Sequence, residues 1–211
     1  MKLAVIGASG RTGRILVEQA LAEGHEVRAA IHRYNPFKPT PGLTPVQCNG
    51  RQIEDVEHLL DGCEAVVSLI GHGWKSPAQL QTDTIRNVLG AMELQHINRI
   101  ISLTGTGVRM PGDSITLIDR LMNLTIRLIG PKRIRDGIQH VRVLQESDTQ
   151  WTVVRVLKLA NFRTAQFRLS LHGPAKTFVP RADVALAILE VLDHASYVGQ
   201  MPIIASSQDL E

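Results

Sequence analysis

A glycine-rich segment near the start of the chain contains the residue types that point most directly to chemistry. It reads VIGASGRTG over residues 5–13 and follows an apolar run. Gly7 allows a sharp turn out of a strand, Gly10 leaves room for a pyrophosphate beside the backbone, and Gly13 allows a helix to pack closely on the strand. A helix beginning near Thr12 would direct free N–H groups at the phosphates. The segment therefore predicts a dinucleotide-binding loop.

The end of the second predicted strand indicates which dinucleotide binds. A site for NAD normally has an Asp or Glu there, which binds the 2′-hydroxyl of the adenosine ribose. Here the strand ends in His32 and Arg33, with no acidic residue beside them. These two side chains, with Arg11 of the glycine-rich segment, suit a 2′-phosphate through charge-assisted hydrogen bonds. The pattern favours NADP(H) over NAD(H); the alternative is that one or both arginines are only solvated.

Composition narrows the class of protein. The chain has 211 residues, of which 44% are hydrophobic and 20% charged, and these values fit one globular domain with a buried core. The net charge of +3 comes without a long basic run, so we expect no nucleic-acid partner. Two cysteines and eight scattered histidines show no ligand spacing, so we expect no metal site. The strand-like start and the lack of a long apolar run favour a cytoplasmic protein that does not contact membranes.

Strand-like and helical segments alternate along the chain. Alternating units of this kind predict a single α/β domain, a Rossmann-like doubly wound parallel sheet with helices on both faces. Ligands of such sheets bind beyond the carboxyl ends of the strands. The expected strands are 2–6, 26–31, 45–48, 65–70, 99–103, 151–156 and 201–205, and the expected helices are 12–23, 52–61, 77–95, 115–129, 134–147 and 182–192.

The predicted helix 115–129 places its polar residues on one face. Isoleucines and leucines fill the rest of its surface. We expect this helix to pack on the sheet edge or over the site; a dimer face and a lid over an apolar substrate are the alternatives, and membrane contact is the least favoured. Monomer and homodimer both remain open. The polar residues are Thr116, Asp119, Arg120, Asn123 and Arg127.

Over nearly its whole length the chain resembles the atypical short-chain dehydrogenase/reductases of the NmrA-like group. Within that group it is most similar to the biliverdin-IXβ reductase/flavin reductase type. The segments that carry the resemblance are VIGASGRTG, EVRAAIHR, DGCEAVVSLIGHG, IRNVLGAMELQHINRIISLTGTG, LQESDTQWTVVR and PRADVALAILEVL.

The resemblance implies where an NADP(H) cofactor would lie. The pyrophosphate would bind in the glycine-rich segment, the 2′-phosphate at its basic neighbours, and the nicotinamide near the end of the fifth strand. Asn49 replaces an Asp that the family often has near the adenine. The implied cofactor residues are Gly7, Ser9, Gly10, Arg11, Thr12, Gly13, His32, Arg33, Asn49, Leu69, Ile70, Gly71, Thr104 and Gly105.

The chain departs from the family at the residues that normally transfer a proton. The Tyr-x-x-x-Lys pair of standard members is missing, because the only match, Tyr34 to Lys38, contains Pro36. Reductases of the flavin-reductase type do not need that tyrosine. They usually carry a Ser where this chain has Gly105.

The resemblance implies an NADPH-dependent reductase of a planar acceptor such as a flavin, a quinone or a tetrapyrrole. The alternative is a non-catalytic NADP(H)-binding redox sensor or assembly factor. Thr104, Thr106 and Lys158 are the candidates on the acceptor side, in a pocket formed by loops after residue 105 and around 158–180. Trp74 is a further candidate for stacking, and His140 is expected to be structural.

Overall fold

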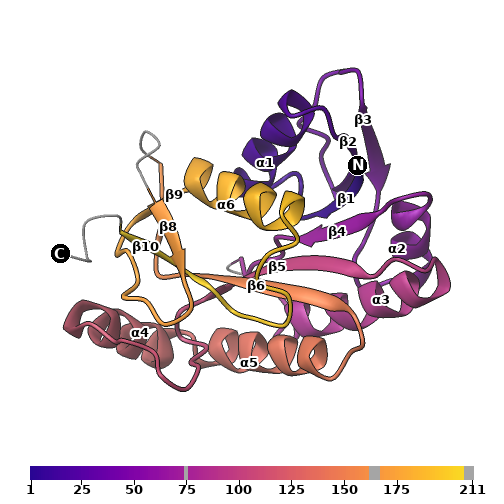
Figure 1. Cartoon of the computed structure of the whole chain (residues 1–211). Coiled ribbons are helices and arrows are strands. Elements are labelled where there is room, and N and C mark those ends of the chain that lie inside the picture. The colour runs from indigo at the N-terminus through magenta and orange to yellow at the C-terminus, as the bar shows by residue number, and fades with distance from the viewer. Residues whose placement is uncertain (74–75, 162–166, 207–211) are drawn as a thin grey trace.

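An eight-stranded sheet forms the centre of the molecule in the computed structural model, which describes residues 1–73, 76–161 and 167–206 (Figure 1). The strand order is β3-β2-β1-β4-β5-β6-β10-β8. All neighbouring pairs are parallel except β10 with β8. The strands are β1 (Lys2–Ile6), β2 (Glu26–Ile31), β3 (Leu43–Gln47), β4 (Ala65–Ser68), β5 (Arg99–Gly105), β6 (Gln150–Val156), β8 (Phe167–Ser170) and β10 (Ile203–Ser206).

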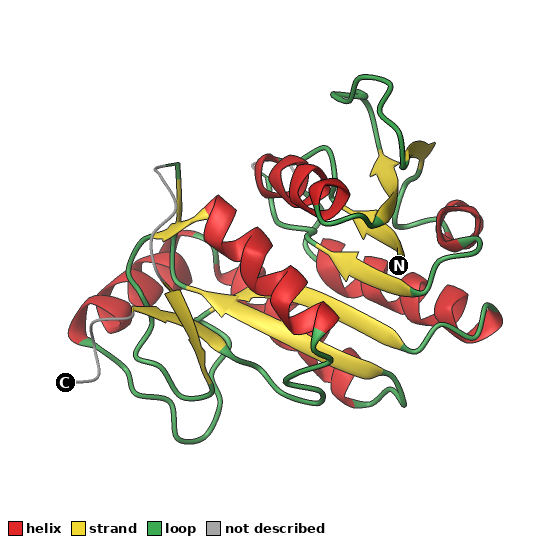
Figure 2. Cartoon of the chain, turned by 45° about the horizontal axis from the view of Figure 1, so that its top comes forward, coloured by secondary structure: helices red, strands yellow, loops and turns green. Residues whose placement is uncertain are grey.

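Helices cover both faces of this sheet, as Figures 1 and 2 show. Helices α1 and α6 pack against each other on one face, and α2, α3 and α5 lie together on the other. The sheet is therefore doubly wound, as the sequence predicts. The helices are α1 (Arg11–Ala22), α2 (Ile53–Leu60), α3 (Leu80–Leu94), α4 (Leu117–Ile129), α5 (Pro131–Gln145) and α6 (Arg181–Asp193).

The central strands are buried on both faces, which explains their continuous apolar sequences. In β1, Leu3 and Val5 join the core beneath α1 and α6, whereas Ala4 and Ile6 join the core beneath the other helices. Side chains alternate between the faces of a strand, so one short segment serves two cores.

Three short strands, β7 (Leu159–Ala160), β8 and β9 (Val179–Pro180), were not predicted from the sequence, whereas β10 beside β6 was. The strand β8 runs antiparallel to β10 at the sheet edge, and β7 pairs with β9 in a separate two-stranded sheet. The predicted parallel sheet is therefore confirmed for its seven strands, and β8 is an additional antiparallel strand at its edge. Short, half-buried segments such as β8 lack the apolar run that identifies a covered strand.

Candidate functional site

The glycine-rich loop between β1 and α1 has the tight geometry that its sequence predicts. Gly7 has a φ of +80°, and a Cβ there would lie 2.9 Å from the carbonyl oxygen of Leu69. A Cβ on Gly13 would lie 2.2 Å from the carbonyl oxygen of Gly7, so only glycine lets α1 approach the loop this closely. The loop closes with a hydrogen bond from the Gly10 amide to the Gly7 carbonyl, at 3.0 Å.

The first turn of α1 presents unused N–H groups at the carboxyl edge of the sheet. Gly10 caps the helix without a side-chain hydrogen bond, and the first turn contains no acidic residue. Ser9 is half-buried, Arg11 is exposed and Thr12 is buried at this end. A helix start of this kind binds an anion with its amides and its dipole. The residues present fit a dinucleotide pyrophosphate.

The side chains predicted to meet the adenosine end lie after β2 and β3. His32 and Arg33 are exposed, and within the described ranges neither side chain makes a hydrogen bond or an ion pair. Asn49 is half-buried and is partly committed to its own loop, because its Oδ1 accepts from the Arg51 amide at 3.2 Å. The His32 and Arg33 side chains thus remain available for a 2′-phosphate at the end of β2.

Arg181 is a residue near the glycine-rich loop that the sequence analysis did not single out. It begins α6, is buried, and its Nη1 donates to Asn161 Oδ1. Burial and the nearby charge of Arg11 lower the pKa of the Arg181 guanidinium. Within the described residues, neither Arg11 nor Arg181 contacts a carboxylate. Two guanidinium groups placed near each other in this way favour the binding of an anion between them. Its position in the PRADV segment was the available sequence signal.

The loop after β4 touches both the glycine-rich loop and α3. The Leu69 amide donates to the Ile6 carbonyl at 2.9 Å, and Gln81 Nε2 donates to the Ile70 carbonyl at 2.8 Å. Gly71 is exposed, and nothing lies within 4 Å of where its Cβ would stand. The three predicted residues of this loop therefore form one side of an open edge beside the phosphate-binding loop.

A small cavity opens where β5 ends. Its volume is about 180 Å³, and residues from β5, the following loop, α4 and α5 line it, together with His72, Gln81 and Leu157. Thr104 and Gly105 lie in its wall, and their place beside a nicotinamide stays a prediction. A Cβ on Gly105 would meet no heavy atom closer than 3.9 Å, so the site has room for the serine that the resemblance leads one to expect.

Thr106 and Lys158, the other two candidates for the acceptor side, differ in their contacts. The Thr106 hydroxyl donates to Asp119 Oδ1 at 2.9 Å and accepts from Asn123 Nδ2 at 3.1 Å, so it is bonded to α4. Asp119 also accepts from Arg109 Nη1 at 2.5 Å. Lys158 is exposed, and its Nζ lies 5.1 Å from the centroid of the Phe178 ring. The catalytic roles of these side chains stay predictions.

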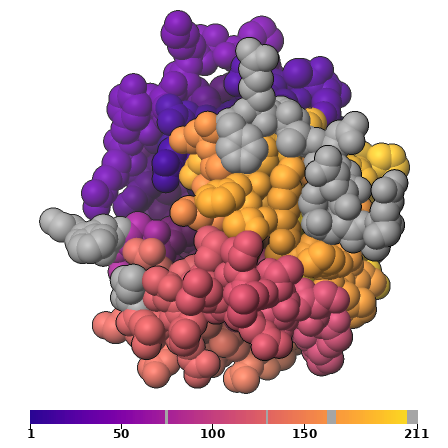
Figure 3. Space-filling view, turned by 90° about the vertical axis from the view of Figure 1, so that its left-hand side faces the viewer, coloured from indigo at the N-terminus to yellow at the C-terminus, as the bar shows by residue number. Residues whose placement is uncertain are grey.

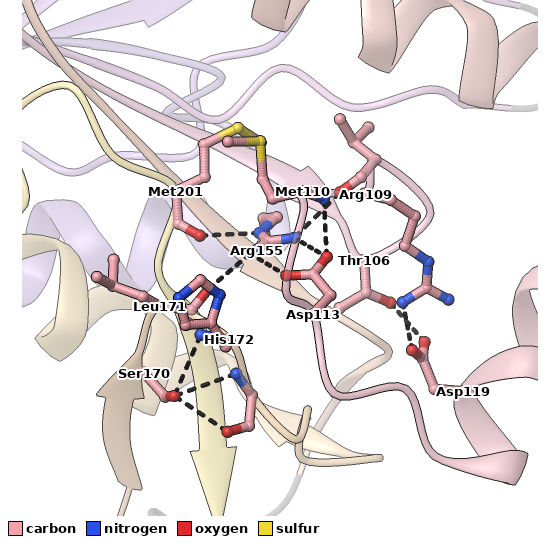
Figure 4. A network of polar contacts seen from close by, with 12 residues as sticks. Thr106, Arg109, Met110, Asp113, Asp119, Arg155, Ser170, Leu171, His172 and Met201 are labelled. Atoms are coloured by element: carbon pink, nitrogen blue, oxygen red, sulfur yellow. Dashed lines mark hydrogen bonds and ion pairs between the residues drawn. The ribbon is translucent and has the colours of Figure 1, made fainter.

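A buried ion pair holds the loop between β5 and α4 in place (Figure 4). Arg155 on β6 is fully buried and binds both carboxylate oxygens of Asp113, at 2.6 and 2.9 Å. Its remaining N–H groups include donors to the carbonyls of Met201 and Leu171. Burial alone would raise the pKa of Asp113, but the hydrogen bonds from Arg155 and from the Met110 amide hold that pKa below its usual value. The pair fixes the loop that forms the cavity wall.

A histidine in the cavity wall is paired with a buried carboxylate. His72 Nε2 lies 2.7 Å from Asp136 Oδ2, and the Asp136 side chain is fully buried. Asp136 also accepts from the amides of Gln81 and Thr82 at the start of α3. The carboxylate therefore both caps a helix and orients the imidazole. Neither role was apparent from the sequence, because His72 and Asp136 are 64 positions apart. Trp74, in the same loop, lies outside the described residues.

Two further clusters lie away from this edge. His140 Nε2 is 2.8 Å from Ser102 Oγ, and burial lowers the pKa of His140 to about 4, consistent with the structural role expected for it. The side-chain ligand atoms of Glu23, His25 and Asp193 lie within 4.8 Å of one another. This group joins the end of α1 to the end of α6, and we interpret it as a polar contact between the two helices. The expectation of no metal site stays a prediction.

Comparison with known proteins bears on the glycine-rich loop and on the sheet together. The model of a family described as NAD(P)H-binding matches residues 7–195. The chain belongs to this NAD(P)H-binding family. Its cofactor is accordingly a nicotinamide dinucleotide. The residues at the carboxyl edge of the sheet, around the glycine-rich loop, fit such a cofactor.

Relatives share this fold over nearly their full length. The chain is 22% identical to YwnB, an uncharacterized protein of Bacillus subtilis, over 99% of this chain and 100% of that protein. A short-chain dehydrogenase/reductase of Veillonella parvula, solved in complex with NADP, superposes with a TM-score of 0.82 at 16% identity, covering 98% of this chain and 95% of the other. The oxidoreductase ylbE of Lactococcus lactis superposes with a TM-score of 0.83 at 17% identity, covering 98% of this chain and 91% of the other. These similarities show the fold.

Proposed function

We propose that this member of the NAD(P)H-binding family is a reductase that transfers hydride from NADPH to a planar, conjugated acceptor such as a flavin, a quinone or a tetrapyrrole. The observation that carries the proposal is the cavity at the end of β5, beside the edge that fits the cofactor. The resemblance to the NmrA-like group and its flavin-reductase type supports the same reading.

The preference for NADPH over NADH rests on charge at the end of β2. His32 and Arg33 are exposed, and the ends of Arg11 and Arg181 add cations near the glycine-rich loop. A 2′-phosphate carries the charge that such groups bind, whereas a ribose 2′-hydroxyl offers them little. No acid stands at the end of β2 to bind that hydroxyl.

The absence of a tyrosine acid is consistent with a conjugated acceptor. Tyr34 is 75% exposed in the loop after β2, and Tyr197 donates to the Leu169 carbonyl, so neither belongs to the cavity. The nicotinamide supplies the hydride when the cofactor is bound, and the protein supplies binding and orientation. A conjugated ring system takes hydride at one atom and delocalises the resulting charge, so the proton can follow from a weaker donor.

His72 is the protein group that we propose as this proton donor. Its imidazole lines the cavity, and a buried carboxylate holds one ring nitrogen. A protonated His72 would keep its Nε2–H on Asp136 and offer Nδ1–H to the reduced acceptor. The sum is NADPH plus acceptor plus one proton giving NADP⁺ and the reduced acceptor, and solvent reprotonates the imidazole.

A specific observation favours the alternative, an NADP(H)-binding sensor or assembly factor without turnover. The cavity of about 180 Å³ is smaller than the roughly 300–1,000 Å³ typical of sites for drug-sized ligands. A sensor would need the cofactor site and a surface that responds to it, but no space for a large acceptor.

Oxidation of NADPH by the purified protein, followed by absorbance against flavins, quinones and biliverdin, distinguishes the two functions. We expect saturable turnover with one acceptor class and a lower kcat for His72→Phe. His58→Gln is the matched control, because His58 is an exposed histidine on α2. Tight NADPH binding with no turnover on any acceptor would establish the alternative.

A further inference from the structure

The helix α4 presents its apolar side chains to solvent, the reverse of what an amphipathic helix on a core normally does. Half of the large hydrophobic residues that are exposed in the described ranges belong to this one helix, six of twelve. Leu117, Leu121 and Leu128 are 82%, 64% and 75% exposed. Two of its polar residues point inward instead: Asp119 is 1% exposed, and the Asn123 side chain donates a hydrogen bond to it. An exposed apolar surface of this kind marks an interaction site.

The spacing of the exposed residues forms one continuous stripe. Leu117, Leu121, Leu124 and Leu128 follow each other at intervals of four, three and four residues, which brings them to one side of a helix. The sequence predicts that the polar residues of this helix gather on one face, but in the structure these residues differ in burial. Asp119 and Asn123 hold the helix to the loop after β5, while Arg120 and Arg127 are exposed.

The charges around the leucine stripe have one sign. Between residues 115 and 136 the only acids are Asp119 and Asp136, and both are buried and hydrogen-bonded. The bases of the same segment are all exposed, namely Arg120, Arg127, Lys132, Arg133 and Arg135. Figure 3 looks onto this end of the molecule, where α4 (pink) lies across the lower part of the view.

A groove of about 510 Å³ runs between α4 and α5 beside the stripe. Among the described residues that line it are Arg109, Arg120, Arg127 and Arg135, together with apolar side chains and no acid. Arg109 is paired with Asp119, but within the described ranges the other three arginines make no ion pair. The groove therefore combines cationic groups with an apolar floor.

From these observations we infer, against the expectation from the sequence, that α4 and the start of α5 form a surface that binds anionic phospholipid bilayers. The leucine stripe enters the boundary between headgroups and acyl chains, and the arginines of the groove bind lipid phosphates. None of the helices in the described part of the chain is long and apolar enough to cross a membrane, so the contact is with one leaflet. The inference does not depend on hydride transfer.

A second copy of the chain fits this surface less well. A twofold symmetric dimer sets the same patch of each copy against the other. The exposed charges of the patch are five bases per copy, so such a dimer would bring like charges together around the leucines without an acid to pair them. An anionic lipid surface satisfies the same charges.

Vesicle co-sedimentation of the full-length protein tests the inference. We expect binding to vesicles of phosphatidylglycerol and phosphatidylcholine, little binding to pure phosphatidylcholine, and weakening as salt is added. The variant Arg120→Gln/Arg127→Gln should partition roughly 25-fold less, at about fivefold per cation. The variant Leu117→Ser/Leu121→Ser/Leu128→Ser should lose at least about tenfold.

Matched controls lie on other surfaces of the molecule. Leu94→Ser changes a leucine that is 66% exposed at the end of α3, and Arg142→Gln changes an exposed arginine on α5; both should bind like the wild type. Absence of binding to anionic vesicles would overturn the inference, as would equal binding by the leucine variant. Analytical ultracentrifugation gives the third outcome: a dimer that the leucine substitutions dissociate would show that the surface is a homodimer interface instead.

Discussion

The two ends of the sheet's carboxyl edge are built by different means. At the end that fits the cofactor (the cofactor end), backbone atoms of the glycine-rich loop and of the loop after β4 pack so tightly that Gly7 and Gly13 tolerate no side chain. At the end that we propose for the acceptor (the acceptor end), residues of β5, of the loop after it, of α4 and of α5 form most of the cavity wall, and the pairs Arg155–Asp113 and Thr106–Asp119 hold the loop after β5. The backbone geometry that family members need to bind a dinucleotide requires glycines at fixed spacing, so a short sequence motif predicts it. The side chains of the cavity wall come from positions far apart in the sequence, so no short motif predicts them.

Removing the buried ion pair should have the largest effect on the acceptor end. Arg155→Met leaves the Asp113 carboxylate buried without its partner, and we expect a loss of about 3–5 kcal/mol in the free energy of unfolding. Chemical denaturation measures it. Arg142→Met, at an exposed position, should change little. The double variant Arg155→Met/Asp113→Leu should regain part of the loss, and no regain would show that the pair does not act as a unit.

A side chain in the glycine-rich loop should damage the cofactor end almost as much. Gly13→Ala forces a Cβ to within 2.2 Å of a backbone oxygen, so we expect at least about 3 kcal/mol of destabilisation and loss of NADPH binding. Thermal unfolding and a fluorescence titration report the two effects. Gly71→Ala is the matched substitution in open space, and it should leave the melting temperature unchanged. Equal effects of both would contradict the packing described here.

Acidification should weaken the core behind the acceptor end. Burial lowers the pKa of His140 to about 4, whereas a histidine in the unfolded chain titrates near 6.5. The unfolded state therefore binds more protons between these values, and stability should fall by about 3 kcal/mol as the pH drops from roughly 6.5 to 4. His140→Gln should remove this slope between pH 7 and pH 5, and the exposed-site variant His58→Gln should keep it.

The preference for NADPH over NADH tests the cofactor end with a smaller expected change in free energy. Arg33→Ser should raise the dissociation constant for NADPH about 10–100-fold, because one charge-assisted contact with the 2′-phosphate is lost. Binding of NADH should change less than about twofold. Arg14→Ser alters an exposed arginine on α1 and serves as the control in isothermal titration calorimetry. An equal loss for both cofactors would contradict the assignment.

The smallest effect is expected at Gly105. A Cβ there meets nothing within 3.9 Å, so Gly105→Ser should change the free energy of unfolding by less than about 0.5 kcal/mol. The same variant adds a hydroxyl at the cavity wall, at the position where the flavin-reductase type that the sequence resembles usually has a serine. Thermal unfolding tests the first statement, and a large loss of stability would show that the wall is packed like the glycine-rich loop.

Local patterns predicted the geometry of the glycine-rich loop, because its features are local in sequence. The strand–glycine–helix order of residues 2–23 determines the loop, and continuous apolar runs identify the central strands. The acceptor end depends on contacts between distant positions, such as His72 with Asp136. The period of α4 indicated an amphipathic helix, but period alone does not say which face is inward. That depended on Thr106 and Asp119, 13 positions apart.

Transfer of deuterium from NADPH labelled at the hydride-donating carbon is the most decisive test of the proposed hydride transfer. The protein is mixed with the labelled cofactor and the acceptor that binds best, and the products are examined by mass spectrometry. We predict deuterium in the reduced acceptor at short times, before the label exchanges with solvent, together with NADP⁺ in equal amount. Labelled NADPH that stays bound and unchanged beside every acceptor would contradict the account and identify the protein as a binder of NADP(H).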